Sequence, residues 1–280
     1  MKKITRRSFL AAAGLSVAAL ALTACGGSSS SVASSVASSA AASSEAASTS
    51  AAAGELTTVE AGKLTMATNA TFPPYEMTTD SGEIEGIDVE TAQAIADKLG
   101  LELQIDDMDF DAALLSVQQG KADIVMAGVT VTDERKAVMD FSDSYATGIQ
   151  SIIVPESSDI ASPDDLAGKK IGTQRGTTGY IYCSDDFGDD AVVAYDNGLT
   201  AVQALNNGQV DAVVIDNAPA KEYVAANPGL TILDTSYAEE DYAIGMAKGS
   251  SLEAAVNAAL EELKADGTLQ AIVDKYITAE

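Results

Sequence analysis

Three residues that follow a short apolar run have the types and the spacing needed to bind a carboxylate group. The run, residues 124–127, predicts a buried strand, and Gly128, Thr130 and Arg135 come soon after it. A guanidinium holds a carboxylate with two parallel charge-assisted hydrogen bonds, and a hydroxyl and a backbone amide add further donors. The alternative is that Arg135 is a surface arginine in a helix ion pair, and this stretch alone does not decide between the two.

An internal repeat supplies an opposite wall for such a site. Residues 120–126 (GKADIVM) match residues 208–214 (GQVDAVV) in pattern, and the second segment leads to Asp216. Each segment follows a stretch with helical apolar spacing, so the chain contains two similar units that each end a strand in polar residues. Because ligands of open α/β sheets bind beyond the carboxyl ends of the strands, we expect Arg135 and Asp216 to face each other across a cleft.

A cation on one wall and an anion on the other suit a zwitterion, such as an α-amino acid. Arg135 would bind the α-carboxylate and Asp216 the α-ammonium, and the loop that leads into Thr178 would add amides and hydroxyls at a helix start. Phe72 and Phe110 would contact the side chain of the ligand. The alternatives are that Asp216 is a helix cap and that both phenylalanines are ordinary core residues.

The composition excludes several classes of function. The chain has 280 residues, no histidine, two cysteines, 42 acidic and 16 basic residues, and a formal net charge of -26. The lack of histidine removes histidine-based triads, zinc sites and general bases, and the negative charge argues against nucleic-acid binding. We therefore predict no catalytic residue, no metal ligand and no cofactor, and we expect Cys183 to be a small buried residue rather than a nucleophile.

The first residues predict export and a lipid anchor. Basic residues precede the apolar residues 9–22, which are too few for a membrane span, so residues 1–24 are expected to be a signal peptide. The ending Leu22-Thr23-Ala24-Cys25 resembles the lipobox of bacterial lipoproteins, in which the cysteine is lipidated. Residues 5–10 also resemble a twin-arginine export signal, and an ordinary basic leader is the alternative. The lipidated cysteine and the Ser- and Ala-rich stretch that follows it, residues 25–56, are expected to form a flexible tether.

The rest of the chain alternates predicted strands and helices. Strands are predicted at residues 63–69, 101–105, 124–127, 149–154, 170–173, 191–195, 212–215, 230–233 and 242–246, and helices at residues 88–99, 110–119, 199–206, 250–267 and 269–277. This order predicts an α/β fold with mostly parallel sheets flanked by helices. Asp88 and Asp133 are expected to cap helices, and Pro73 and Pro74 predict an irregular loop over residues 69–75.

Six motifs occur in order along the globular part of the chain. They are ATNATFPPYE at residues 67–76, GIDVE at 86–90, AGVTVTDER at 127–135, DFS at 140–142, GTT at 176–178 and DAVVID at 211–216. Through them, residues 62–280 resemble the extracellular substrate-binding proteins for polar amino acids that serve bacterial ABC importers, solute-binding protein family 3.

The resemblance implies a two-lobed, periplasmic-binding-protein-like fold of type II, with the ligand in the cleft between the lobes. It implies a first lobe of residues 57–147 plus 243–280 and a second lobe of residues 148–242. The chain would cross between the lobes twice, near residues 146–149 and 237–244.

The resemblance also implies roles for the residues of the cleft. Gly128, Thr130 and Arg135 would bind the α-carboxylate with help from Thr178, and Asp216 would bind the α-ammonium.

Other positions bear on the side chain of the ligand. Asn69 stands where relatives for basic amino acids often carry aspartate, which argues against a cationic ligand. By the resemblance, Gln174 and Arg175 would lie at the pocket edge, where an inward Arg175 would suit an acidic ligand and an outward one would lie on the rim. We therefore expect a neutral polar amino acid such as glutamine.

The predicted function is capture without chemistry. The lobes would close over a free amino acid and deliver it to the permease subunits of an ABC transporter. This would take place at the outer side of the cell membrane, to which the lipid on Cys25 would anchor the protein. One alternative is an enzyme on the same fold, similar to cyclic-acid dehydratases, with Glu76 or Asp216 as acid or base. Another is a ligand-sensing receptor lipoprotein, which would need a separate signalling partner.

Overall fold

The computed structural model describes residues 56–277. The predicted signal peptide, the proposed lipidation site at Cys25 and nearly all of the predicted tether lie outside the described residues. Within residues 56–277, no helix is both long and apolar enough to cross a membrane.

The first lobe is built on a five-stranded sheet with the strand order β5-β1-β6-β14-β7. The strands are β1 (Lys63–Thr68), β5 (Glu102–Asp107), β6 (Ile124–Val125), β7 (Met139–Phe141) and β14 (Gly245–Ala247). β1 pairs in parallel with β5 and β6, whereas β14 runs antiparallel to both β6 and β7.

Helices cover both faces of this sheet, which explains why its strands are apolar on both sides. The helices are α1 (Ile87–Leu99), α2 (Phe110–Gln118), α3 (Asp133–Val138), α7 (Glu253–Ala265) and α8 (Thr268–Tyr276). Met66 and Ile124 pack into the cluster beneath α1, α7 and α8, while Ala67 and Val125, their neighbours in sequence, pack beneath α2. This alternation follows from the two-residue period of a strand.

The second lobe is built on a six-stranded sheet with the order β10-β9-β11-β8-β12, with β13 also paired to β8. The strands are β8 (Ala146–Pro155), β9 (Ile171–Gln174), β10 (Val192–Tyr195), β11 (Ala212–Asp216), β12 (Leu230–Ile232) and β13 (Ala238–Tyr242). The helices are α4 (Thr178–Phe187), α5 (Gly198–Asn206) and α6 (Asn217–Ala226), with short 3-10 turns at Pro163–Leu166 and Asp189–Ala191. β9 pairs in parallel with β10 and β11, and β8 is antiparallel to its partners. Both sheets are therefore mixed, because β14 in the first sheet and β8 in the second run against the other strands of their sheets.

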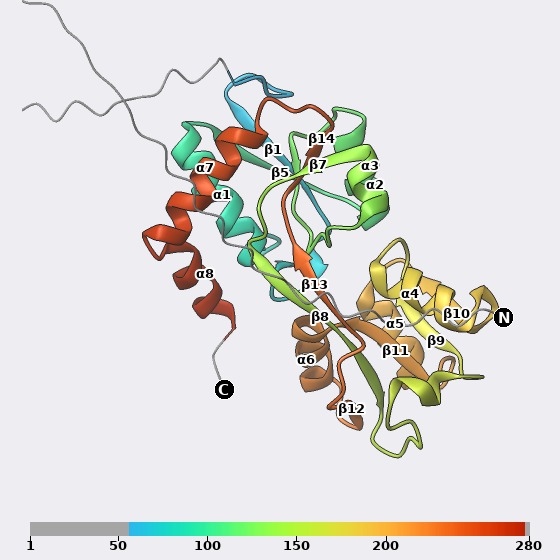
Figure 1. Cartoon of the computed structure of the whole chain (residues 1–280). Helices are drawn as coiled ribbons and strands as arrows, with labels where there is room; N and C mark the ends of the chain where they lie inside the picture. The colour runs from blue at the N-terminus through green and yellow to red at the C-terminus, as the bar shows by residue number, and fades with distance from the viewer. Residues whose placement is uncertain (1–55, 278–280) are drawn as a thin grey trace, which may run out of the picture. The chain divides into compact units, whose positions relative to one another are not determined.

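Two strands connect the lobes. β8 and β13 pair antiparallel from Ala146 opposite Tyr242 to Gln150 opposite Ala238, and they lie side by side between the two sheets (Figure 1). The expectation of one strand over residues 242–246 is wrong, because the chain leaves β13 at Tyr242 and enters the first lobe as β14 at Gly245.

A small third sheet borders the space between the lobes. It consists of β2 (Thr71–Phe72), β3 (Glu76–Thr78) and β4 (Ile84–Glu85), and the Pro73-Pro74 peptide bond between β2 and β3 is cis. The predicted irregular loop over residues 69–75 is therefore partly a hairpin. The hairpin contributes Phe72 and Glu76 to the space between the lobes.

Two predicted helix caps are corrected. Asp88 does not cap α1, because its carboxylate is fully buried and accepts from the amide of Gly128 at 3.0 Å and the hydroxyl of Tyr145 at 2.7 Å. α3 is capped by the Thr132 hydroxyl, which accepts from the amide of Arg135, rather than by Asp133. Asp88 thus supports the loop after β6 instead of capping the start of a helix.

Candidate ligand-binding site

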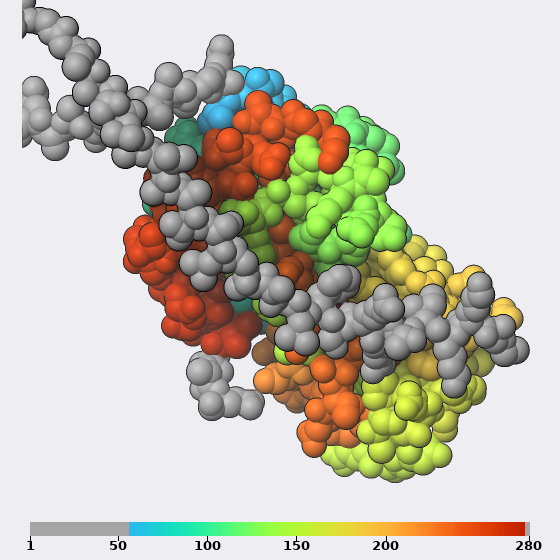
Figure 2. Space-filling view, in the orientation of Figure 1, coloured from blue at the N-terminus to red at the C-terminus, as the bar shows by residue number. Residues whose placement is uncertain are grey.

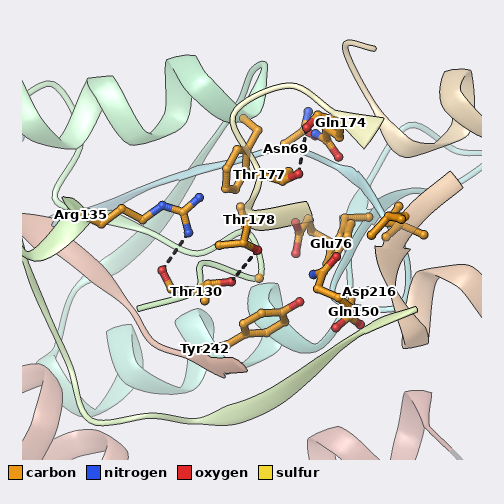
Figure 3. A pocket seen from close by; sticks show the side chains of 16 residues that line it. Asn69, Glu76, Thr130, Arg135, Gln150, Gln174, Thr177, Thr178, Asp216 and Tyr242 are labelled. Carbon is orange, nitrogen blue, oxygen red and sulfur yellow. Dashed lines mark hydrogen bonds between the residues drawn. The ribbon is translucent and has the colours of Figure 1, made fainter. Parts of the chain in front are cut away.

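One pocket contains all nine residues predicted to bind the ligand. It has an empty volume of about 450 Å³ and is lined by Asn69, Phe72, Glu76, Phe110, Ala127, Gly128, Thr130, Arg135, Gln150, Gln174, Thr177, Thr178, Val214, Ile215, Asp216 and Tyr242. Figure 3 shows the polar side chains converging on the same space from both lobes.

The ends of the strands explain why these residues meet. Asn69 follows β1 and Gly128 follows β6 in the first lobe, while Gln174 ends β9 and Asp216 ends β11 in the second lobe. Parallel strands in each sheet bring their carboxyl ends to one edge, and the two edges face each other here. Gly128 has a φ of 55°, and a Cβ there would lie 2.7 Å from the ring of Phe72, so the close approach requires glycine.

Arg135 is a buried pocket residue rather than a surface residue. Only 8% of it is exposed, and its guanidinium lies 5.4 Å from the centre of the Phe110 ring. Nη1 donates to the carbonyl of Thr130 at 2.8 Å, and Nη2 donates to the carbonyl of Gly176 at 3.1 Å. Residues 56–277 contain no ion pair between Arg135 and an acidic side chain, so the alternative of a surface ion pair is wrong.

Asp216 caps a helix and also lines the pocket. Its Oδ1 accepts from the amide of Ala218 at 3.0 Å and caps α6, while its Oδ2 accepts from the amide of Ile149 at 2.7 Å. The same carboxylate lines the pocket. Each carboxylate oxygen can accept a second hydrogen bond, so capping does not prevent binding of an ammonium. Burial raises the pKa of Asp216 to about 6.

Two of the three threonines that line the pocket, Thr130 and Thr178, meet across the lobes. Oγ1 of Thr130 lies 3.4 Å from Oγ1 of Thr178 and donates to Oε2 of Glu240 at 3.1 Å. The same Glu240 oxygen accepts from Nε2 of Gln150 at 3.0 Å. Glu240 lies on β13 and was not predicted as part of the site, since its exposed neighbours in sequence give no sign of burial.

An amide pair links the lobes at another side of the pocket. Nε2 of Gln174 donates to Oδ1 of Asn69 at 2.9 Å, and Nδ2 of Asn69 donates to the carbonyl of Met108 at 2.9 Å. Arg175 points elsewhere, because its side chain is 57% exposed and lies 3.7 Å from Asp196. Of the two orientations considered for Arg175, the structure shows the one on the rim.

Glu76 is a buried acid that sequence reasoning considered only as a catalytic group. It is fully buried and lines the pocket, and neither of its oxygens has a hydrogen-bond partner of acceptable geometry among the described residues. Burial, together with the negative charge of Asp88, raises the pKa of Glu76 well above its usual range. A glutamate at the start of a short strand is common in protein sequences, so the residues around Glu76 did not predict that its side chain lines the pocket.

Comparison with known proteins identifies the family. Residues 64–279 match the model of the bacterial extracellular solute-binding proteins, family 3, and the chain belongs to this family. It is similar to the L-cystine-binding protein TcyJ of Escherichia coli (strain K12), with 33% identity over 79% of this chain and 85% of the relative. It is also similar to a probable histidine-binding protein of Neisseria gonorrhoeae, with 34% identity over 96% of this chain and 95% of the relative.

A solved structure gives the same result for the fold. An ancestral arginine-binding protein bound to glutamine matches with a TM-score of 0.75 and 42% identity, over 78% of this chain and 99% of that chain. The predicted two-lobed fold is therefore confirmed. The chain is a solute-binding protein of a polar amino acid importer, and membership in an extracellular family indicates a location outside the cytoplasm.

Proposed function

We propose that this protein captures one free amino acid by closing its lobes over it, and delivers it to the permease subunits of an ABC transporter. The observation that carries the proposal is the pairing of Arg135 in the first lobe with Asp216 in the second, both buried and both lining one pocket. Opposite charges on opposite walls match the two ends of a zwitterion. The two residues lie on different lobes, so only the closed form can contact the carboxylate and the ammonium of one ligand at the same time.

Arg135 is the proposed anchor of the α-carboxylate. A guanidinium has five N–H donors, and the two hydrogen bonds to Thr130 and Gly176 leave others for a ligand. The hydroxyls of Thr130 and Thr178 and the backbone at Gly128 complete this end of the proposed site. Asp216 is the proposed acceptor for the α-ammonium. A ligand held with a micromolar Kd has a binding free energy of about 8 kcal/mol, to which the two charged anchors contribute.

Closure is proposed to be a movement of residues 148–242 against residues 57–147 and 243–280 about the β8–β13 pair. Hydrogen bonds that cross between the lobes support it, including Gln174 to Asn69 and Tyr223 to the carbonyl of Thr71. The two lobes also lie against each other in the space-filling view (Figure 2). A ligand that binds the closed form more tightly shifts the population toward it.

The first proposed ligand is glutamine. The amide groups of Asn69 and Gln174 present both donors and acceptors to the pocket, which suits a neutral amide side chain. The solved structure of the ancestral arginine-binding protein holds glutamine, so a pocket on this fold accepts that ligand. Phe72 and Phe110 would pack against the methylene groups of its side chain.

A second candidate is a cationic amino acid such as arginine. Glu76 favours it, because a fully buried acid beside the negative charge of Asp88 is stabilised in its ionised form by a cation. Citrulline separates the two ligands, since it has nearly the shape of arginine but no charge. Thermal-shift measurements with glutamine, arginine and citrulline would rank them, and stabilisation by arginine but not citrulline would select the cation.

The cellular setting is also a proposal. We infer that residues 1–24 are removed, that Cys25 carries the lipid anchor, and that the stretch up to residue 56 tethers the lobes to the outer side of the cell membrane. Mass spectrometry of the mature protein would test this, because a lipidated Cys25 predicts an acylated first residue.

The decisive experiment for the site is calorimetry with Arg135→Ala. We expect this variant to lose measurable binding of the preferred amino acid, whereas Arg175→Ala should bind normally, because Arg175 is an arginine outside the pocket. Unchanged affinity of Arg135→Ala would refute the proposed anchor. Circular dichroism of both variants would show that the fold is retained.

A further inference from the structure

Glu240 is a buried acid that contacts two residues of the pocket lining, Thr130 and Gln150. It is 6% exposed, lies on β13 between the lobes, and does not itself line the pocket. Its Oε2 accepts from Thr130 and from Gln150, while its Oε1 has no hydrogen-bond partner of acceptable geometry within residues 56–277. A carboxylate in this position needs an explanation, because unsatisfied buried acceptors cost stability.

The hydrogen bonds around Thr130 can be assigned by counting protons. The hydroxyl of Thr130 donates to Oε2 of Glu240, and a hydroxyl has only one proton to donate. The hydroxyl of Thr178, 3.4 Å away, can then donate to the oxygen of Thr130. In this arrangement the Thr130 proton points away from the pocket, although Thr130 lines it.

The charge of Glu240 also acts on the arginine anchor. Burial lowers the pKa of Arg135, and the negative charge of Glu240 opposes that effect. The other titratable groups that interact with this carboxylate are Tyr182 on α4, Asp216 at the end of β11 and Tyr242 on β13. A ligand carboxylate bound at Arg135 would therefore be repelled by the negative charge of Glu240, which lies on the far side of Thr130 from the pocket.

We propose that Glu240 is a positioning residue that limits the affinity of the carboxylate end of the pocket. It competes with the ligand for the Thr130 hydroxyl and repels the ligand carboxylate. This inference rests on the proposed function and refines it. A transport protein must also release its ligand, and a competing acceptor fixed inside the protein favours release.

The competition would persist when the lobes separate. Thr130 is bridged to Tyr242, and the amide of Val131 donates to the carbonyl of Asp241 at 3.0 Å. Backbone pairing therefore holds Thr130 beside the strand that carries Glu240, whereas Thr178 belongs to the other lobe. As the lobes open, Thr130 keeps its internal acceptor and loses the contact with Thr178.

The test is calorimetry with Glu240→Gln, titrated with glutamine and in parallel with arginine. Thr130 and Gln150 bond to the same oxygen of Glu240. An amide nitrogen at that position can donate one hydrogen to Thr130 and the other to Gln150 with the Gln150 amide turned over, which frees the Thr130 proton for the ligand. We expect binding at least about fivefold tighter than in the parent protein, as for one gained hydrogen bond to a charged group. Glu239→Gln is the matched control, because it removes the same charge from the exposed neighbouring residue, and it should leave the affinity unchanged.

Thr130→Val keeps the proposal testable if Glu240→Gln folds poorly. In the parent protein Thr130→Val should weaken binding, but by less than about tenfold, because Glu240 already holds the hydroxyl proton and the ligand loses no hydrogen bond from it. In the Glu240→Gln background the same change should remove the gain, which a double-mutant cycle measures. Weaker or unchanged binding by a folded Glu240→Gln protein, or a tenfold loss with Thr130→Val alone, would overturn the role assigned to Glu240. These outcomes are independent of Arg135→Ala, which tests the proposed function itself.

Discussion

The guanidinium of Arg135 in the first lobe donates to the carbonyl oxygen of Gly176 in the second lobe at 3.1 Å. The proposed carboxylate anchor is thus also a contact between the lobes. The same side chain lies against Phe110 and bonds to Thr130, so its position is set before a ligand arrives. Preorganisation of this kind reduces the entropy lost on binding.

Gly176→Ala should impede closure. Gly176 has a φ of 72°, and a Cβ there would overlap the carboxylate of Asp111 on the opposite lobe. We expect ligand affinity to fall by about tenfold or more, since the closed form must shift while the open form is spared the clash. Calorimetry would measure this loss.

Two further variants separate the clash from backbone strain. Gly208 has a φ of 66° with open space around it, so Gly208→Ala carries similar strain and should bind normally. Asp111→Ala should restore part of the affinity lost in Gly176→Ala. Equal losses in the two glycine variants would contradict the closure argument.

Tyr223→Phe should weaken ligand binding moderately. The Tyr223 hydroxyl donates to the carbonyl of Thr71 at 2.5 Å, between α6 in the second lobe and the hairpin of the first. Loss of one neutral hydrogen bond costs about 0.5–1.5 kcal/mol, which corresponds to a Kd increase of roughly twofold to tenfold. Tyr237→Phe is the control, because its hydroxyl donates to Asp186 within the second lobe. The prediction fails if both variants bind equally well in calorimetry.

Ligand affinity should fall as the pH drops below about 6. Burial raises the pKa of Asp216 to about 6 in the free protein, and an α-ammonium needs the ionised form. Binding is therefore unimpaired above this pH, and below it each pH unit should cost roughly a factor of ten until Asp216 titrates in the complex. Asp216→Asn should bind weakly at every pH and lack this slope. A flat profile for the parent protein between pH 4.5 and 7.5, each value measured by calorimetry, would argue against Asp216 as the ammonium acceptor.

Proton release should distinguish the two candidate ligands. Burial, with Asp88 nearby, raises the pKa of Glu76 well above its usual range, which favours a carboxyl that keeps its proton in the ligand-free protein. Arginine would displace that proton, whereas glutamine would leave it in place. Calorimetry in two buffers with different ionisation enthalpies counts the protons released. Glu76→Gln should abolish the difference between the buffers for arginine. If the difference remains in this variant, the released proton comes from another group.

Cys183 should resist thiol reagents in the folded protein. It is fully buried in the second lobe, and burial raises its pKa to about 12, so little thiolate forms at neutral pH. Labelling with a chromogenic disulfide should be slow in buffer and complete in denaturant. Rapid labelling of the folded protein would show that the core around α4 opens readily.

The anchors at the strand ends were predictable from the sequence because their signals are local. An apolar run followed by glycine, hydroxyls and an arginine identified Gly128, Thr130 and Arg135, and the internal repeat identified Asp216. All of them line the pocket, and their contacts with a ligand stay predictions. Local patterns carry this much information because parallel strands place their carboxyl ends at one edge of the sheet.

Other features depend on long-range pairing and had no local signal. Glu240 and Tyr242 reach the site because β13 pairs with β8, almost a hundred residues earlier in the chain. Asp88 looked like a helix cap because the helix signal is local, whereas its partners Gly128 and Tyr145 are distant in sequence. Tertiary contacts outweighed the local preference in each case.

The two sheets differ in how the chain passes through them. Every strand of the six-stranded sheet comes from one uninterrupted stretch that begins with β8 and ends with β13, whereas the five-stranded sheet needs β14 between β6 and β7. A chain that emerges from the ribosome N-terminus first therefore completes the second sheet at Tyr242, while the first sheet lacks an interior strand until Ala247 follows. We expect a nascent chain halted between these two residues to hold a finished second lobe beside an unfinished first one.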